Sequence, residues 1–261
     1  MVLVQSLYLL AAAQSGSTAV DWRWDRESSG CGLLQAINSR GDIIGLGGTP
    51  GNAYTAVTIK DHAGGKIPAR TLSGGFVSFG AGESVEADVS VSRDAAGFRS
   101  IVASSPDRDA MAKISRASTV EISHPKLGTV KAVVRSAAAA VDAIIKCEDL
   151  KMREWGMDPT AWRALKSKPV PLKPLWELLS PYDYPQLAAA YRVEGKVIIR
   201  LDVSSDGRVT GCKPLNSLRY KGFEDSVCSV FRKSARFRPA TGPDGNAVSA
   251  PHVLTVNFVL R

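Results

Sequence analysis

The chain has 261 residues, of which 44% are hydrophobic and 22% are charged. This composition excludes a disordered chain and supplies enough apolar residues for the cores of one or two domains. The formal net charge of +8 is compatible with nucleic acid, an anionic membrane surface or an acidic cell-wall polymer as a partner, and it does not choose among them.

The N-terminus is an apolar run from Val2 to Ala13 that ends in three alanines. It is too short to span a bilayer, which needs about 20 apolar residues. It fits the hydrophobic region of a secretory signal with cleavage after Ala13, although no Lys or Arg precedes the run. We therefore expect a signal peptide over residues 1–13 and an exported protein. The alternatives are a buried first strand or a mis-assigned start.

Residues 20–155 are expected to form a β-rich domain, because alternating or β-branched runs are separated there by Gly, Asp, Ser and Pro clusters. The expected strands cover residues 19–24, 31–37, 54–60, 84–93, 98–105 and 118–123. The glycine-rich segment Gly45–Asn52 lacks the Lys-Ser/Thr pair of a phosphate loop, and Pro50 stands where a dinucleotide fingerprint needs glycine. This segment is expected to be a turn.

Two helices are expected in the same region. A short helix covers residues 107–116, and a longer one runs from Val134 to Trp155, where apolar residues recur at helical spacing. The segment KSKPVPLKP follows, and it is the proline-dense stretch of the chain. Proline-rich composition is typical of a linker, which we place over residues 156–179.

The last 80 or so residues predict a second, small domain with the order β-β-α-β. A strand from Val197 to Val203 alternates apolar and polar residues, and the Asp206-Gly207 turn reverses it into a second strand. A helix follows, and a last alternating strand runs to the C-terminus. The helical stripe consists of Phe223, Val227, Val230 and Phe231. The fold class is therefore α+β.

Four cysteines, an even number without a C-x-x-C pair, allow three disulfide connectivities. In an oxidising compartment we favour two disulfide bonds that each join cysteines of the same expected domain. The alternative is a reduced set of small core residues, and no metal site is expected because the histidines lie far along the chain from every cysteine. The favoured pairs are Cys31–Cys147 and Cys212–Cys228, and the histidines are His62, His124 and His252.

Residues 180–261 resemble the C-terminal domain of the TonB family, periplasmic proteins that couple the inner-membrane proton gradient to outer-membrane transporters. The motifs occur in the family's order: YP at Tyr184-Pro185, a helical segment to Gly195, the strand IIRLDV, the turn SSDGRV, the helix FEDSVCSVFRKSARFRPA and a terminal strand. The resemblance implies that a transporter segment, the TonB box, adds as a strand beside residues 252–260. The implied partner-binding residues are Tyr184, Pro185, His252, Val253, Thr255, Asn257 and Val259.

The resemblance also implies a periplasmic location and an inner-membrane motor complex as a further partner. The competing hypothesis is a structural or cell-wall interaction protein that uses this domain only for binding, with peptidoglycan as a candidate partner, and a homodimer through the last strand is a third arrangement. A basic cluster on the helix is either a solvated face or a contact for an acidic partner, whereas nucleic acid is not expected. This cluster consists of Arg232, Lys233, Arg236 and Arg238.

We expect no cofactor and no enzyme activity, because no nucleophile or metal-protease motif occurs in the sequence. A Cys-His hydrolase would need a free thiol beside one of the three histidines.

Overall fold

The computed structural model describes residues 22–25, 30–52, 54–62, 70–80, 82–93, 97–107, 109–216, 220 and 222–260. The expected signal peptide at residues 1–13 lies outside these ranges. Within them, no helix combines the length and the apolar composition that a membrane span requires. The fold is mixed α and β, as expected.

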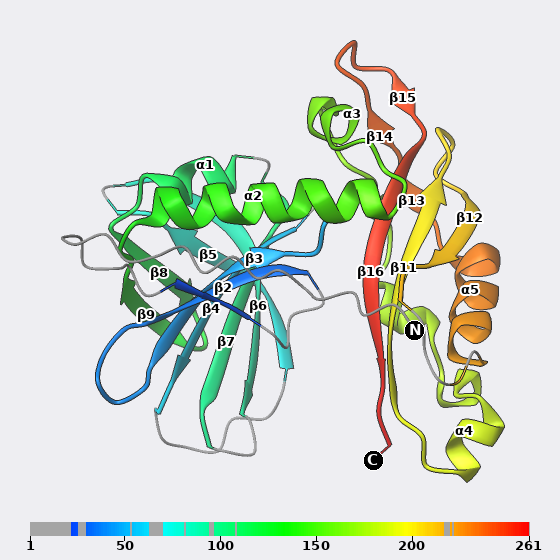
Figure 1. The fold of residues 1–261 in the computed structure, drawn as a ribbon, viewed down its shortest axis with the longest axis horizontal. Coiled ribbons are helices and arrows are strands. Elements are labelled where there is room, and N and C mark those ends of the chain that lie inside the picture. The colour runs from blue at the N-terminus through cyan, green and yellow to red at the C-terminus, as the bar shows by residue number, and fades with distance from the viewer. Residues whose placement is uncertain are drawn as a thin grey trace, which may run out of the picture.

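The N-terminal part is built on one antiparallel sheet of nine strands, in the order β1-β2-β3-β4-β7-β6-β5-β8-β9 (Figure 1). In β6 every second residue is buried, which is the alternation expected of a sheet with one covered face. The strands are β1 (Trp22–Trp24), β2 (Cys31–Ala36), β3 (Ile43–Gly48), β4 (Thr55–Asp61), β5 (Arg70–Ser78), β6 (Ser84–Arg93), β7 (Arg99–Ser105), β8 (Thr119–His124) and β9 (Gly128–Val133).

Two helices, α1 (Ala110–Ser115) and α2 (Ala137–Glu154), lie along one side of this sheet (Figure 1). The apolar stripe of α2 faces the strands because Val141 and Ile144 lie in the same buried cluster as Ile44 and Ile101. This cluster is the core of the N-terminal part.

The prediction of a turn over Gly45–Asn52 is wrong for its first half, since residues 45–48 belong to β3. A Cβ atom at Gly45 would lie 3.0 Å from Leu34 Cδ2, and one at Gly47 would lie 2.3 Å from the Cys31 carbonyl oxygen. The glycines thus allow β2 and β4 to approach β3 closely. The turn itself is shorter, and in it the Asn52 N–H donates to the Thr49 carbonyl over 2.9 Å.

The C-terminal part contains a three-stranded antiparallel sheet in the order β12-β11-β16, with α5 packed on one face. Val197, Ile199 and Leu201 of the central strand are 0% exposed and face Phe223 and Phe231 of α5. The elements are η2 (Pro181–Asp183), α4 (Gln186–Ala190), β11 (Gly195–Val203), β12 (Val209–Pro214), α5 (Gly222–Ser234), β14 (Ala240–Thr241), β15 (Ala247–Val248) and β16 (Ala250–Phe258).

Residues 156–179, the expected linker, form defined elements rather than an extended spacer. They comprise α3 (Pro159–Ala164), β10 (Val170–Pro171) and η1 (Leu175–Leu178). The short strand β10 pairs with β13 (Phe237–Arg238), and an ion pair between Arg163 and Asp149 joins α3 to α2. This segment therefore packs against both parts of the chain.

A third buried cluster joins the two parts where the end of α2 meets the C-terminal sheet. The Arg200 Nη1 atom on β11 donates to the Trp155 carbonyl over 2.8 Å. The cluster is formed by Met152, Trp155, Met157, Trp162, Ala240, Ala250 and Val253. As a result the outer strand β16 lies on the side of its sheet that faces the N-terminal part (Figure 1).

Both expected disulfides are present. Cys31 on β2 pairs with Cys147 on α2, and Cys212 on β12 pairs with Cys228 on α5. Each bond ties a helix to the sheet on which that helix packs.

Candidate strand-addition site

The outer strand β16 presents alternate main-chain groups to β11 and away from it. In the register of this antiparallel pair, Leu201 lies opposite His252 and Ile199 lies opposite Leu254. The even-numbered residues of β16 bond to β11, so the N–H and C=O groups of the odd-numbered residues point outward. Pro251 fits this assignment, because proline has no N–H to donate and is tolerated in a strand on the side without a neighbour.

The predicted partner-binding residues of β16 differ in their exposure. Asn257 is exposed, Val259 is 58% exposed and Thr255 is half-buried. His252 and Val253 are 2% and 0% exposed, so neither side chain can face a partner. His252 lies against Phe237, with ring centroids 5.0 Å apart. The accessible part of the strand is thus its C-terminal half.

Tyr184 points into the domain rather than toward the outside of β16. Its hydroxyl donates to the Val193 carbonyl over 2.8 Å, and its ring lies edge-on to Phe223 and Phe258 at centroid distances of 5.6 and 5.5 Å. Pro185 directly precedes α4. Tyr184 therefore contacts the end of β16 through Phe258, and both Tyr184 and Pro185 are half-buried.

Exposed apolar side chains gather at the end of the domain where β11 begins and β16 ends. Tyr182 is 96% exposed, Tyr191 77% and Leu187 61%. No periodicity in the sequence distinguishes these residues, and the one signal is the density of tyrosines around the YP motif.

The four residues of the basic cluster do not share one face: Arg232 lies beside β12, whereas Arg238 lies on β13, opposite Val170 of β10. Arg232 Nη2 donates to the Cys212 carbonyl over 3.1 Å, and Arg236 Nη1 donates to the Ala235 carbonyl over 2.7 Å. Lys233 and Arg238 are exposed. Arg232 therefore caps an outward carbonyl of the other edge strand, β12, which is one way in which natural sheets protect an edge.

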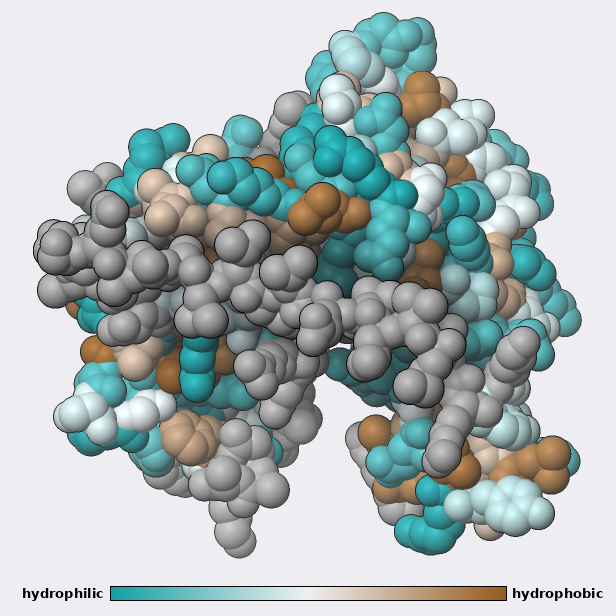
Figure 2. Space-filling view, viewed as in Figure 1, coloured by the Kyte–Doolittle hydropathy of each residue, from teal (hydrophilic) through white to brown (hydrophobic). Residues whose placement is uncertain are grey.

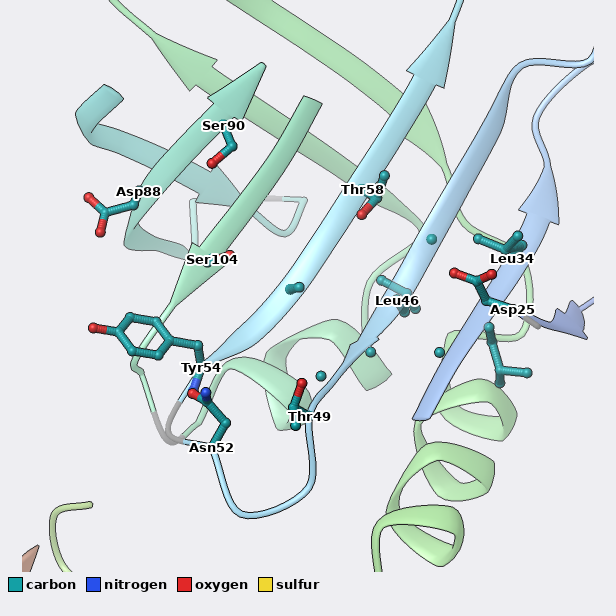
Figure 3. A pocket seen from close by; sticks show the side chains of 16 residues that line it. Asp25, Leu34, Leu46, Thr49, Asn52, Tyr54, Thr58, Asp88, Ser90 and Ser104 are labelled. Atoms are coloured by element: carbon teal, nitrogen blue, oxygen red, sulfur yellow. The ribbon is translucent and has the colours of Figure 1, made fainter. Parts of the chain in front are cut away.

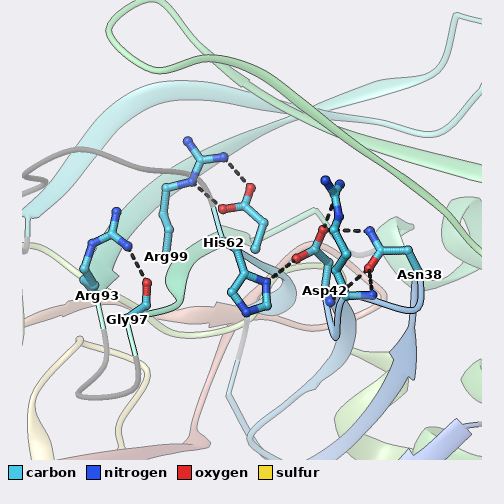
Figure 4. A network of polar contacts seen from close by, with 8 residues as sticks. Asn38, Asp42, His62, Arg93, Gly97 and Arg99 are labelled. Carbon is cyan, nitrogen blue, oxygen red and sulfur yellow. Dashed lines mark hydrogen bonds and ion pairs between the residues drawn. The ribbon is translucent and has the colours of Figure 1, made fainter.

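The histidines and cysteines do not form a nucleophile–base pair. All four cysteines are in disulfides, so the free thiol required by the hydrolase hypothesis is missing. Figure 4 shows His62 in a network of polar contacts: its Nδ1 lies 2.9 Å from Asp42 Oδ1, and Asn38 Nδ2 donates to the same carboxylate. Hydrogen bonds from Asn38 and His62 hold the pKa of Asp42 below its usual value. Among the described residues, no group of three His, Cys, Asp or Glu side chains could hold a metal ion.

The open face of the nine-stranded sheet carries a recess of about 480 Å³. Figure 3 shows its polar side chains, among them Thr58, Asp88 and Ser104, on β4, β6 and β7. Asn52 and Tyr54 lie at the end of the β3–β4 hairpin that borders it (Figure 3). The recess exists because the residues of β2 and β3 on this face are mostly glycine, which leaves space above the strands.

Two groups near the junction of the two parts, the half-buried Glu148 and the buried His252, have pKa values that are shifted in opposite directions. Burial raises the pKa of Glu148 on α2 to about 7, from 4.5. Burial lowers the pKa of His252 to about 4, from 6.5. Between pH 4.5 and 6.5 the folded state holds the Glu148 proton more tightly than the unfolded state, so stability falls as the pH rises. His252 acts in the opposite direction, because the unfolded state binds its proton more tightly, and the two dependences oppose each other.

Replacing Glu148 by Gln should therefore expose the contribution of His252. We expect the free energy of unfolding of E148Q to rise by about 2 kcal/mol between pH 4.5 and 6.5, while that of the native chain changes by less than about 1 kcal/mol. The measurement is urea denaturation at half-unit pH steps. H252Q is the matched variant and should show the reverse slope. Identical pH profiles for E148Q and the native chain would contradict the assignment of Glu148.

The strand order, the single covering helix and the outer strand β16 together define a small α+β domain with a three-stranded antiparallel sheet. Residues 180–260 match the family model described as "Gram-negative bacterial TonB protein C-terminal", and they belong to this family. The chain is also 40% identical over 62 residues to a curated relative, "Protein TonB" of Klebsiella aerogenes. That match covers 23% of this chain and 26% of the relative, so the chain spans about a quarter of the length of the relative it matches.

Proposed function

We propose that this protein binds a short extended segment of an outer-membrane transporter, the TonB box, by adding it as a strand beside β16. The observation that carries the proposal is an outer strand with outward main-chain groups around Asn257, in a segment that belongs to the TonB C-terminal family. We place this activity in the periplasm, as part of energy transduction for transport, with an inner-membrane motor complex as the source of force. No catalytic step and no cofactor is part of the proposal.

The physical basis is that a strand edge offers unpaired N–H and C=O groups to any extended peptide. Each main-chain hydrogen bond contributes about 0.5–1.5 kcal/mol net, and the side chains that alternate along the added strand supply selectivity. Asn257 and Val259 are the exposed side chains of β16 and its C-terminal extension that a bound segment would contact.

A second candidate is a cell-wall or structural binding protein that uses the same strand without transmitting force. The observation that favours it is the ordered segment 156–179, in which β10 pairs with β13 and holds the C-terminal sheet close to the rest of the chain. In a TonB-type energy transducer, the family resemblance implies a long Pro-rich spacer ahead of this domain instead.

Replacing Asn257 by Pro should weaken binding of a TonB-box peptide at least tenfold. Proline removes the outward N–H at the centre of the proposed site, whereas the bonds between β16 and β11 come from the even-numbered residues and remain. A tenfold loss of affinity corresponds to about 1.4 kcal/mol, which is comparable to the net contribution of one main-chain hydrogen bond. The measurement is an amide chemical-shift titration of the full chain.

N257A is the control, because alanine keeps the N–H and removes only the side chain. It should bind within about threefold of the native chain. Equal binding by N257P and N257A, or shifts that avoid β16 altogether, would exclude strand addition at this edge.

A further inference from the structure

The middle of the β16 edge is occupied by a loop from the N-terminal part of the same chain. We call Thr49–Asn52, between β3 and β4, the edge loop. The Val253 N–H donates to the Gly51 carbonyl over 3.0 Å, and Asn52 Nδ2 donates to the Val253 carbonyl over 2.7 Å. Both outward main-chain groups of Val253 are therefore bonded within the chain, by residues about 200 positions earlier in the sequence.

The edge loop is held in one conformation by its own contacts. The Tyr54 N–H donates to Asn52 Oδ1 over 3.0 Å, which leaves the Asn52 amide nitrogen directed at Val253. Gly51 has a φ of +77°, and a Cβ atom there would lie 2.8 Å from Val253 Cγ2 and 2.9 Å from Met157 Cε. Glycine adopts this backbone conformation without strain and leaves room for both side chains.

The edge loop also lies against the buried cluster at the junction of the two parts. Val253 is 0% exposed, and it lies in one buried cluster with Met157 and Trp155. Arg200 on the neighbouring strand donates to the Trp155 carbonyl over 2.8 Å. Displacing the edge loop would therefore open a packed apolar contact as well as two hydrogen bonds, and each unpaired buried group would carry its own cost.

An added strand can extend only as far as this contact. On the C-terminal side of this contact, the surface is hollowed between the two parts of the molecule, below the point where they touch (Figure 2). The six residues from Leu254 to Val259 span about 20 Å at about 3.3 Å per residue. Asn257, with its exposed side chain, lies within this stretch.

We propose that the edge loop sets the register and the maximum length of the segment that β16 accepts. This inference rests on the proposed function. The partner that fits is an extended segment of about six residues that turns away from the sheet where it meets Asn52. Gly51 and Asn52 are thus specificity-determining residues, supplied by the N-terminal part to a site on the C-terminal part.

The test compares two synthetic peptides from one TonB-box segment, six and twelve residues long and sharing the same core, each titrated into the full native chain. We expect dissociation constants within about twofold of each other. Amide shifts should be concentrated from Leu254 to Val259, and the Val253 amide should keep its hydrogen-exchange protection.

The N52D variant then weakens the stop, because it removes one of the two hydrogen bonds that hold the loop on Val253. Aspartate can still accept the Tyr54 N–H, but it cannot donate to the Val253 carbonyl and places a carboxylate beside it. The twelve-residue peptide should bind N52D about threefold to tenfold more tightly than the native chain, with shifts now reaching Val253, whereas the six-residue peptide should be unaffected. N246D, in the exposed β14–β15 loop, is the charge-matched control and should leave both peptides unaffected.

Two failures are distinguishable. If both peptides bind but the longer one binds the native chain more tightly and shifts the Val253 amide, the loop is displaced rather than acting as a stop, and this inference alone is overturned. If neither peptide shifts any β16 amide in the native chain or in N52D, the proposed function itself fails.

Discussion

Replacing Cys31 and Cys147 together by alanine should lower the free energy of unfolding by about 5 kcal/mol. The disulfide joins residues separated by 116 positions, and the stabilisation expected from restricting the unfolded chain grows with the length of the closed loop. The bond also ties β2 to α2, so its loss loosens the helix that covers the N-terminal core. The measurement is urea denaturation followed by circular dichroism, with the native chain kept oxidised.

The second disulfide provides the comparison. Cys212 and Cys228 are 16 positions apart, and replacing both by alanine should cost about 3 kcal/mol. The two double variants should therefore differ by about 2 kcal/mol in the stated order. Equal losses, or a larger loss for the short loop, would show that native contacts around the sulfur atoms outweigh the effect of loop length.

Replacing Gly207 by alanine should destabilise the C-terminal part by about 3 kcal/mol. Gly207 has a φ of +80° in the turn between β11 and β12, and a Cβ atom there would lie 2.1 Å from the Phe237 carbonyl oxygen. The clash would be with a main-chain atom. Phe237 is held close to the turn because its N–H donates to the Gly207 carbonyl over 2.9 Å, so β13 would have to be displaced. The left-handed conformation and the displacement of β13 each add to the loss.

Gly245 is the matched control. Its φ is +84°, but a Cβ atom there would meet nothing within 4 Å. G245A should therefore lose only the conformational contribution, about 1 kcal/mol. The comparison uses urea denaturation of both variants under the same conditions. If G207A and G245A lost the same stability, the turn would be able to move away from Phe237.

The C-terminal part shows how much can be predicted when local periodicity is strong. Alternation from Val197 to Val203 predicted a strand with one buried face, and these apolar residues are buried against α5. The Asp206-Gly207 turn and the helical stripe were predicted for the same reason, because a turn and an amphipathic helix each depend on residues within a few positions of one another. The likeness to the TonB family rested on the order of these elements.

Strands β3, β5 and β9 were not predicted. The glycines of β3 have low strand propensity and no side-chain alternation, and they form a strand because β2 and β4 pack closely on both sides. The predicted linker likewise gave no local sign that β10 would pair with β13, whose residues lie more than 60 positions later. These segments are strands because they form hydrogen bonds with neighbouring strands, and such pairing is not indicated by the residues of one segment alone.

The sequence by itself thus determined the elements with strong local periodicity and the family of the last 80 or so residues, and it favoured the disulfide pairs that the structure contains. Only the tertiary structure brought the edge loop onto Val253, across a separation of 201 positions between Asn52 and Val253. The contact is made largely by main-chain groups, which nearly every residue carries, so the amino-acid pattern at neither end indicates it. It forms because packing of Met157 and Trp155 against the C-terminal sheet places the two segments side by side.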